Sequence, residues 1–443
     1  MTPCTRRPWG PLAYPEFLAG AQNVAPHTEG RGSPRAQDPD AGQRAAKQHI
    51  TVEFAAVKAL EFDRKEARYV AAAVSSRLRP GSGARTGPLA LVDADQKDLP
   101  SPEWERITTR LAGICGSDLA TVDGRSARYF EPWVSFPFVP GHEVVGERSD
   151  GTRVVLEPVL GHEARGFEPP FEGAAPGDGN DYRHLVAGDI EAGIQTGYCA
   201  STSGGWSTEF VAHPSQLHAI PDALSDEAAV LVEPAAVGVH AALRTSIEPG
   251  ATVAVLGAGT MGLTTVAALR HFTEAGDIII GAKYPEQKAM ATAFGATTVV
   301  DPNQVPRAVR RVSGSFEIGD DLSGGADVVI DAVGSAASLD QAIGICRPRG
   351  TVVLVGMPGK VAVDFTALWH RETTLVGAYT YGTETLADGT SRRTFDMAIE
   401  LAGAVDLGQL VSATYPLARY EDALEHAANA GRRGAVKICF DLR

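Results

Sequence analysis

The sequence has few cysteines and no long hydrophobic runs. Its 443 residues include five cysteines, Cys4, Cys115, Cys199, Cys346 and Cys439, which are scattered and odd in number. A disulfide scaffold needs paired cysteines in an oxidising compartment, so we expect a protein of the reducing cytoplasm. No apolar run approaches the roughly 18–20 residues of a membrane-spanning helix, so no membrane partner is expected.

An excess of positive charge is also missing. The chain carries 40 basic and 54 acidic residues, a net charge of −14, and has no basic stripe. Nucleic-acid binding is therefore not expected. With 44% hydrophobic and 21% charged residues the composition is globular, and the length fits two or three domains.

The first 54 residues lack any helical or strand periodicity. They are rich in Pro, Gly, Ala and Arg, and we predict a disordered N-terminal extension over 1–54. Arg6-Arg7 invites a twin-arginine export signal, but Pro8 and Pro11 interrupt the apolar segment that such a signal requires. A true start at Val57 is the other explanation for this stretch.

A glycine motif marks a nucleotide-binding turn. Val253–Leu256 is predicted to be a short buried strand, and Met261–Phe272 has helical spacing. Between them lie Gly257, Gly259 and Gly262. The first glycine permits a tight turn, the second lets a pyrophosphate approach the backbone, and the third lets helix and strand pack closely.

Further strands and helices alternate after this turn. The predicted strands are Asp277–Ile280, Thr297–Val300, Asp327–Asp331, Thr351–Val355 and Thr374–Val376, and the predicted helices between them include Glu286–Phe294 and Ser338–Cys346. This alternation predicts a parallel, doubly wound sheet in an α/β protein. We place this dinucleotide-binding domain at 241–382.

The second of these strands ends without the acidic residue that grips the ribose of NAD. Ala282 occupies that place and Lys283 follows it. Loss of the carboxylate removes its repulsion of a 2′-phosphate, and a lysine can pair with that phosphate, which favours NADP over NAD. The alternative is that Lys283 is only a solvated surface residue.

Three separate segments carry residues suited to a metal. Cys115 is followed 27 residues later by His142, and Glu233 comes further on. A thiolate, an imidazole and a carboxylate are the ligands of a catalytic zinc with one open position. Asp118 could then orient the imidazole ring, and Ser117 could carry the proton of a substrate hydroxyl. Taken singly, each residue could instead be ordinary core or surface.

These motifs together resemble the medium-chain, zinc-dependent alcohol and polyol dehydrogenase superfamily. The residues that carry the resemblance are Gly113–Asp118, Gly141–Gly146, Glu233-Pro234, Gly257–Gly262, Asp331–Gly334 and Leu354–Met357. The resemblance covers about 55–443, and the segment 233–238 is most similar to the sorbitol, threonine and glucose dehydrogenase branch. It implies a GroES-like β-barrel catalytic domain, formed by 55–240 and 383–443, with the Rossmann cofactor domain between them.

The resemblance also implies roles for individual residues. Zinc would be held by Cys115 and His142 together with Glu143 or Glu233. The implied catalytic residues are Ser117, Asp118 and Glu143; the implied cofactor-binding residues are Gly257, Gly259, Met261, Gly262, Lys283, Val333, Val355 and Met357. A homodimer or homotetramer is the expected assembly.

The sequence departs from the family in two places. Relatives often hold a structural zinc with four cysteines, but the equivalent stretch, about 162–198, contains none, so we predict one zinc per chain. His162, Glu163 and His184 could form a substitute metal site, although their spacing fits no zinc motif and solvated loop positions are favoured. Ala120 stands where some relatives place a proton-relaying histidine.

We therefore predict a zinc-dependent oxidoreductase that interconverts an alcohol (a polyol, sugar or secondary alcohol) and a carbonyl with NADP or NAD. Two alternatives remain at this point: a zinc-free reductase of the quinone or enoyl type on the same fold, and a non-catalytic NADPH-binding protein.

Two smaller expectations concern packing. Trp206 suits either a substrate pocket or the core, and the charge run 61–68 predicts a solvated hairpin face.

Overall fold

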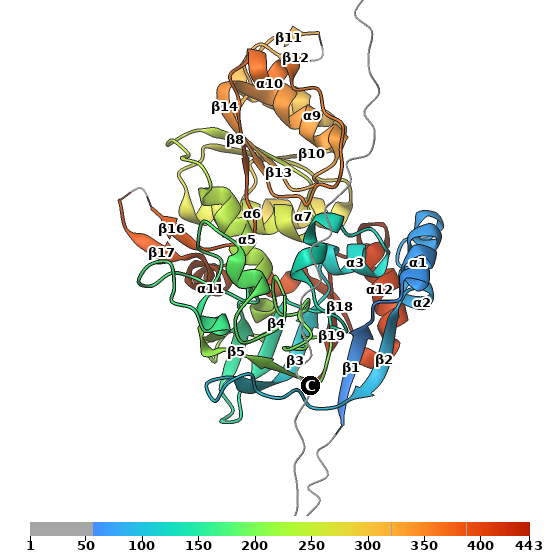
Figure 1. Ribbon diagram of the computed structural model, residues 1–443. Helices are drawn as coiled ribbons and strands as arrows, with labels where there is room; N and C mark the ends of the chain where they lie inside the picture. Colours follow the sequence, from blue (N-terminus) through green and yellow to red (C-terminus); the bar gives the residue numbers. More distant parts are fainter. Residues whose placement is uncertain (1–55, 320, 387) are drawn as a thin grey trace, which may run out of the picture. The chain divides into compact units, whose positions relative to one another are not determined.

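The computed structural model describes residues 56–319, 321–386 and 388–443. The predicted disordered extension, 1–54, lies outside these residues. The described chain contains two large sheets, one parallel and one mostly antiparallel, which are built from different parts of the sequence (Figure 1). The parallel sheet uses consecutive residues, whereas the antiparallel sheet combines early and late segments.

The parallel sheet has six strands in the order β10-β9-β8-β13-β14-β15. Their bounds are β8 Thr252–Leu256, β9 Asp277–Gly281, β10 Thr298–Val300, β13 Ala326–Asp331, β14 Cys346–Leu354 and β15 Thr374–Gly377. The register places Val253 beside Ile278 on one side and beside Val328 on the other. This is the predicted doubly wound sheet, and all five strands predicted after the glycine turn are present.

Alternate side chains of this sheet enter two separate cores. Val253 and Val255 join one apolar cluster, whereas Ala254 joins the other. The first cluster is covered by α5, α6, α7 and α11, and the second by α8, α9 and α10. A strand that is buried on both faces has apolar residues at consecutive positions. This is why the strands of the parallel sheet could be predicted from the sequence.

Three helices around the parallel sheet, α6, α7 and α9, begin and end within two residues of the predicted positions, and α5, α8, α10 and α11 were not predicted. Their bounds are α5 Val232–Leu243, α6 Thr260–Phe272, α7 Pro285–Ala293, α8 Val305–Ser313, α9 Ala336–Ile345, α10 Thr366–His370 and α11 Thr394–Ala404. Short pieces complete this half of the chain: η5 Pro302–Gln304, β11 Glu317–Ile318, β12 Asp321–Leu322, β16 Thr383–Thr385 and β17 Ser391–Arg393.

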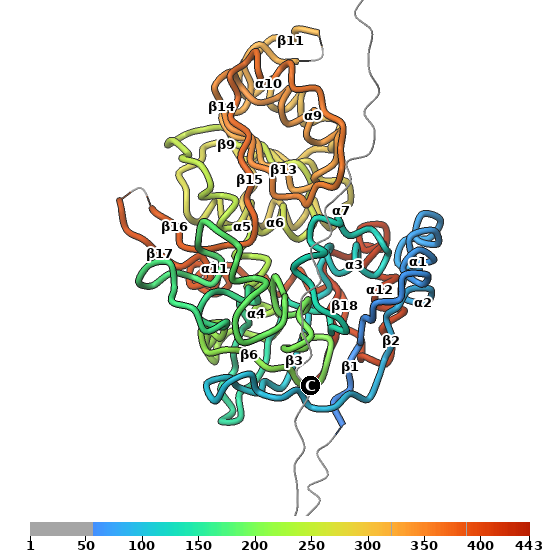
Figure 2. Tube along the Cα trace, viewed as in Figure 1, coloured from blue at the N-terminus to red at the C-terminus, as the bar shows by residue number. Residues whose placement is uncertain are grey.

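The second sheet joins residues from both ends of the described chain. Its path is β18-β19-β3-β4-β5-β7, and β6 also pairs with β3. The bounds are β3 Glu105–Gly113, β4 Val144–Glu147, β5 Arg153–Leu156, β6 Glu209–Ala212, β7 Leu217–Ala219, β18 Val411–Tyr415 and β19 Lys437–Asp441. In the trace of Figure 2 the red C-terminal segment returns to the blue-green residues, since β19 pairs antiparallel with β3.

Helices and turns connect these strands. They are α3 Gly116–Val122, η1 Arg128–Trp133, η2 Glu163–Arg165, η3 Arg183–Val186, η4 Pro214–Gln216, α4 Asp226–Ala229, η6 Leu407–Leu410, η7 Leu417–Arg419, α12 Tyr420–Ala428 and η8 Ala430–Arg433. Among the described residues, no helix is both long enough and apolar enough to cross a membrane.

The first strand pair differs from the expected hairpin. β1 (Val57–Phe62) pairs antiparallel with β2 (Leu89–Ala94), but two helices, α1 (Glu66–Leu78) and α2 (Gly83–Thr86), separate the strands. The hairpin prediction for 61–68 was therefore wrong. The alanine-rich stretch after the charges is a good helix former. Glu61 lies in β1, residues 63–65 form the connection, and Glu66 and Arg68 lie in the exposed first turn of α1.

The cysteine-free segment 162–198 is organised around one buried guanidinium. Arg165 is 1% exposed. It donates hydrogen bonds to the backbone carbonyls of Leu160, Ala187, Ile190, Glu191 and Gly193. A guanidinium offers five N–H donors in a fixed plane, so one side chain ties together both ends of the lobe.

Two histidines of the same lobe lie against each other. The ring centroids of His162 and His184 are 4.0 Å apart, in a stacked arrangement. Burial, with the nearby His162 and Arg165, lowers the pKa of His184 to about 4, so this imidazole is neutral at neutral pH. The two rings therefore serve as packing surfaces of the lobe.

The lobe gives a first prediction. Arg165→Met removes the donors of five carbonyls, and we expect a loss of about 3–5 kcal/mol in the free energy of unfolding. Urea denaturation followed by tryptophan fluorescence measures it. Arg183→Met is the matched control, because Arg183 belongs to the same lobe but is exposed and pairs only with Asp181. Its change should stay within about 0.5 kcal/mol; equal losses in the two variants would contradict the role of Arg165.

Candidate active site

The turn between β8 and α6 has the geometry of a nucleotide-binding loop. Gly257 has a φ of +94°, which L residues with side chains rarely adopt. A Cβ on Gly262 would collide with the carbonyl oxygen of Gly257, so only glycine lets the helix approach the strand. A Cβ on Gly259 would meet no atom within 4 Å, so this face of the turn is open. Met261 follows in the first turn of α6, partly exposed.

This turn lies where the strand order reverses. β8 runs between β9 and β13, and the later strands continue outward from β13. In open parallel sheets, ligands bind at the carboxyl ends of the strands next to such a reversal. The N-terminus of α6 faces the same edge, where its dipole favours phosphate.

The next strand ends carry the other predicted cofactor residues. The buried carboxylate of Asp331 accepts hydrogen bonds from the backbone N–H groups of Val333 and Gly334, at 2.9 and 3.1 Å. This fixes the turn after β13, and the side chain of Val333 is left 50% exposed. Val355 and Met357 follow the adjacent strand β14, and Met357 is also exposed. The structure therefore gathers Val333, Val355 and Met357 beside the glycine turn.

The end of β9 lies on the opposite side of the turn. Ala282 is fully buried and offers no polar group to a ribose. Lys283 is exposed, and its Nζ lies 5.6 Å from the ring centroid of Tyr284. No carboxylate among the described residues forms an ion pair with it. A cation is thus available at the strand end where the ribose carboxylate is missing.

A second cluster forms where three antiparallel strands end together. Cys115 follows β3, His142 and Glu143 precede β4, and Lys437 begins β19. Gly113 N–H donates to the Glu143 carbonyl at 2.8 Å, and Gly113 also pairs with Cys439 in β19. The sheet register therefore brings together residues that are far apart in the sequence.

His142 lies beside both Cys115 and Asp118. It is 4% exposed, and its Nδ1 lies 3.3 Å from Oδ1 of Asp118 without the alignment of a hydrogen bond. The other carboxylate oxygen of Asp118 accepts the backbone N–H of Cys115 at 3.1 Å. Burial alone would lower the pKa of His142, but the negative charges of Asp118 and Cys115 outweigh it and raise the pKa well above its ordinary value. The surroundings of His142 thus favour a positive charge.

Glu143 is engaged by a lysine that the sequence did not single out. Nζ of Lys437 lies 2.7 Å from both carboxylate oxygens of Glu143, and the two side chains are 0% and 4% exposed. Burial would lower the pKa of Lys437, but the charge of Glu143 outweighs it and raises the pKa. Lys437 is therefore charged, and it is the cation that pairs with Glu143.

Glu233 is buried near the same cluster without a cation of its own. It lies in the first turn of α5, and Tyr381 donates its hydroxyl to Oε1 of Glu233 at 3.1 Å. Burial raises the pKa of Glu233 to about 7, with a further contribution from the charge of Glu143, although the charge of His142 opposes both. A cation placed beside this carboxyl would stabilise its charged form.

The donor set fits zinc in its chemistry. Within the described residues, no three His, Cys, Asp or Glu side chains stand close enough to hold a metal ion as they are. Cys115 and His142 nevertheless lie together, and the cluster has an excess of acidic groups, because Lys437 balances Glu143 alone. A thiol, an imidazole and a desolvated carboxyl are suitable zinc ligands. The third ligand would have to come from a small movement of Glu143 or Glu233.

Tyr198 also belongs to this site. Its hydroxyl lies 3.4 Å from Asp118 Oδ1 and 3.1 Å from Thr121 Oγ1, and Thr121 is 2.7 Å from Ser126 Oγ. Burial, followed by the charge of Asp118, raises the pKa of Tyr198 well above its ordinary value, although hydrogen bonds with Thr121 and Ser117 partly oppose this. The phenol therefore stays protonated, and a chain of hydroxyls runs from Tyr198 through Thr121 to Ser126.

Trp206 is part of the core. It is fully buried, donates its indole N–H to the Gly113 carbonyl at 3.1 Å, and packs edge-on against Phe440. Of the two roles that the sequence allowed, the structure shows packing. The tryptophan supports the end of β3, from which Cys115 follows.

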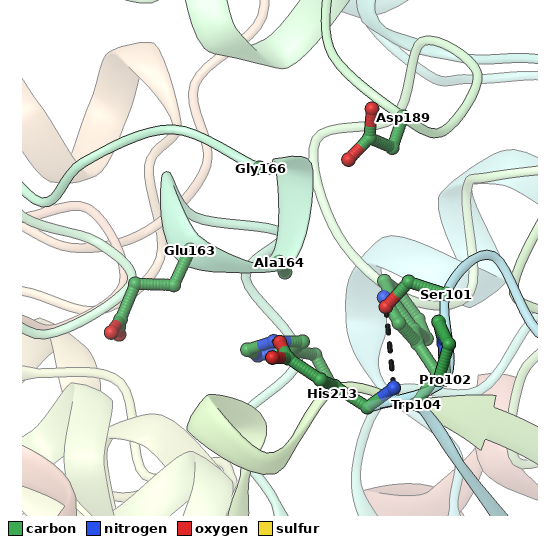
Figure 3. Close-up of a pocket in the computed structure, with 9 residues that line it drawn as sticks. Ser101, Pro102, Trp104, Glu163, Ala164, Gly166, Asp189 and His213 are labelled. Atoms are coloured by element: carbon green, nitrogen blue, oxygen red, sulfur yellow. Dashed lines mark hydrogen bonds and ion pairs between the residues drawn. The ribbon is translucent and has the colours of Figure 1, made fainter.

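The segment before β3 and the cysteine-free lobe form a partly open pocket. It has a volume of about 310 Å³ and is lined by Ser101, Pro102, Glu103, Trp104, Glu163, Ala164, Gly166, Asp189 and His213 (Figure 3). None of the predicted ligand, catalytic or cofactor residues lines it. Glu163 therefore belongs to this cavity rather than to a metal group with His162 and His184.

Comparisons with known proteins agree with the fold and the motifs. Residues 101–222 match the family described as the alcohol dehydrogenase GroES-like domain, and residues 260–394 match the zinc-binding dehydrogenase family. The sorbitol dehydrogenase of Bacillus subtilis (strain 168) is 30% identical over 351 residues, 74% of this chain and 89% of that protein. The L-idonate 5-dehydrogenase of Vitis vinifera is 26% identical over 375 residues, 78% of this chain and 90% of that protein.

A solved structure supports the same architecture. The 2R,3R-butanediol dehydrogenase from Bacillus subtilis superposes with a TM-score of 0.64, at 22% identity, over 87% of this chain and 99% of that chain. Together these findings define an oxidoreductase with a GroES-like and a Rossmann part, as predicted. The chain belongs to the zinc-dependent medium-chain alcohol and polyol dehydrogenase family.

The glycine turn gives a second prediction. Gly262→Ala should lower the melting temperature, because the new methyl group collides with backbone. Gly259→Ala should leave the free energy of unfolding within about 0.5 kcal/mol. It should weaken NADPH binding about tenfold, because its methyl group occupies the open face of the turn. Differential scanning fluorimetry and fluorescence titration with NADPH separate the two effects. Unchanged NADPH affinity in Gly259→Ala would place the pyrophosphate elsewhere.

Proposed function

We propose that this chain interconverts a secondary alcohol and its carbonyl compound by hydride exchange with a nicotinamide cofactor, with one zinc ion at Cys115, His142 and Glu233. The observation that carries the proposal is the proximity of the partly buried Cys115 to the buried His142, in a cluster in which carboxyls outnumber cations. The names of the relatives, which include sorbitol, L-idonate and butanediol dehydrogenases, support the reaction type.

Glu233 is the better third ligand of the two carboxylates. Glu143 is held by Lys437 on both oxygens, so it could reach a metal only after giving up that pair. Glu233 has one hydrogen bond, from a neutral tyrosine. We assign Glu143 to balancing Lys437 and fixing the loop that carries His142.

The bound metal would supply a Lewis acid that stabilises negative charge on the substrate oxygen. The protein's own residues do the remaining work. Asp118 orients His142 and the Cys115 backbone, and Ser117 takes up or returns the hydroxyl proton of the substrate. Because Ala120 cannot relay a proton, the hydroxyls of Tyr198, Thr121 and Ser126 give the route from Ser117 outward.

The cofactor would lie across the reversal of strand order. Gly257, Gly259, Met261 and Gly262 would receive the pyrophosphate, and Val333, Val355 and Met357 the nicotinamide. Lys283 would pair with a 2′-phosphate, so we propose NADP as the preferred cofactor. This assignment rests on the exposed lysine beside a buried alanine at the end of β9.

The same reasoning extends to metal content and assembly. The lobe 162–198 is held by Arg165 rather than by cysteines, so we propose a single zinc per chain. A homodimer or homotetramer remains our expectation, because closed symmetric assemblies are the usual oligomers.

Metal content gives the third prediction. Elemental mass spectrometry should find one zinc per chain in wild type and in the matched control Cys346→Ala, whose sulfur is buried in the other half of the chain. Cys115→Ala should contain none and should lose alcohol oxidation with both NADP and NAD.

Each other outcome has a definite meaning. Two zinc ions per chain would contradict the proposal of a single site. If the wild-type protein contains no zinc but reduces quinones or enoyl compounds, it is a zinc-free reductase. NADPH binding without zinc or turnover would identify a non-catalytic binding protein.

The cofactor preference gives the fourth prediction. Lys283→Ser should raise the Kd for NADPH about tenfold and leave the Kd for NADH unchanged, because only the 2′-phosphate pairs with the lysine. Lys288→Ser is the matched control, because Lys288 also lies near the end of β9 but pairs with Asp301 at 2.7 Å. An equal change in the Kd for NADPH and the Kd for NADH would show that Lys283 does not bind the 2′-phosphate.

A further inference from the structure

Aromatic side chains from three separate segments meet in one group, and one of these segments leads to the candidate site. η1 contributes Tyr129, Phe130 and Trp133, the cysteine-free lobe contributes Tyr182, and the segment after β15 contributes Tyr379. We refer to these five residues as the aromatic wall. Their ring centroids form a continuous series of contacts, from Tyr182 to Trp133 (5.7 Å), to Tyr129 (5.0 Å), to Phe130 (5.3 Å) and to Tyr379 (6.4 Å).

The wall is exposed in a way that packing alone does not explain. Tyr129, Tyr182 and Tyr379 are 66%, 56% and 53% exposed. Three large aromatic residues open to solvent at one place form a feature that soluble surfaces rarely carry without a ligand. Two charged neighbours of the wall are paired with other groups: Glu131 with Arg64, and Arg183 with Asp181.

The wall is continuous with the candidate site through its third segment. Tyr379 lies two residues before Tyr381, whose hydroxyl donates to Glu233. The lobe is fastened to the same segment, because Asp178 accepts hydrogen bonds from the Thr383 N–H and hydroxyl at 3.0 and 2.7 Å. η1 is fastened to the lobe, because the Trp133 carbonyl accepts the Ile194 N–H at 2.9 Å. The three segments that carry the wall are therefore joined to one another, and one of them reaches Glu233 through Tyr381.

We infer that the aromatic wall binds the carbon frame of the substrate, and that the preferred substrate is a secondary alcohol or ketone carrying an apolar ring next to the reacting carbon. Ring faces and edges attract another ring by offset stacking and edge-to-face contact. A linear polyol needs hydrogen-bond partners along its whole length, and the wall offers such partners only at its tyrosine hydroxyls. This inference rests on the proposed function, since it names the substrate class of that site.

The test compares substrates and wall variants. The substrates are 1-phenylethanol, 2-butanol and sorbitol, and the variants are Tyr129→Ala and Tyr182→Ala. Both tyrosines are exposed, so their removal should leave folding intact. Phe316→Ala is the matched control, because Phe316 is an equally exposed ring outside the wall.

We expect wild type to oxidise 1-phenylethanol with a kcat/KM at least about tenfold above those for 2-butanol and sorbitol. Each tyrosine variant should reduce kcat/KM for 1-phenylethanol about three- to tenfold, mainly through KM, and should reduce the value for 2-butanol by a smaller factor. The Phe316→Ala enzyme should match wild type on all three. Better turnover of sorbitol than of 1-phenylethanol, or equal losses for all substrates, would overturn the inference.

A binding measurement separates this inference from the proposed function. Acetophenone and 2-butanone are titrated against wild type and the two tyrosine variants, with tryptophan fluorescence as the signal. Tighter binding of acetophenone that the variants lose, without turnover of any alcohol, would support the wall and refute the proposed function. Turnover of aliphatic alcohols with equal binding of both ketones would refute the wall and leave the proposed function in place.

Discussion

The buried pair of Glu143 and Lys437 is the interaction on which the candidate site depends. It joins the loop before β4 to the start of β19, across 294 residues of sequence. Removing either partner would leave an uncompensated buried charge, which typically costs about 3–5 kcal/mol. The pair also balances the charge of Glu143, the other glutamate near Glu233. One ion pair thus fixes the position of the loop and divides the roles of two glutamates.

Much of the fold could be predicted from the sequence because its signals are local. Val253–Leu256 is apolar, bounded by glycine and followed by helical spacing, and the strand lies within a residue of that position. The charge run 61–68 was misinterpreted because exposed helices and exposed hairpins carry similar charges. Only the alanines that follow, which favour a helix, separate the two.

The residues of the candidate site also fall into two groups, those that the sequence indicates and those that it does not. Cys115, His142 and Glu233 could be found because their residue types are those of a metal site. Lys437, Tyr198 and Tyr381 could not, because Lys437 reaches the cluster through the sheet pairing of β19 and the two tyrosines through loops, and a lone lysine or tyrosine carries no motif. Arg165 was missed for a related reason, since an arginine in a loop usually faces solvent. Its burial depends on carbonyls that turn inward only once the lobe has folded.

The position of β19 has a consequence for the order in which the protein can fold. All six strands of the parallel sheet lie between 252 and 377, so they are synthesised before β19 and can pair as soon as they emerge. The antiparallel sheet must wait, because its β3 pairs with a strand made more than 300 residues later. Until then Glu143 has no lysine beside it, and the edge of β3 is open to other strands. During synthesis, therefore, the half that comes first in the sequence is the half that is completed last.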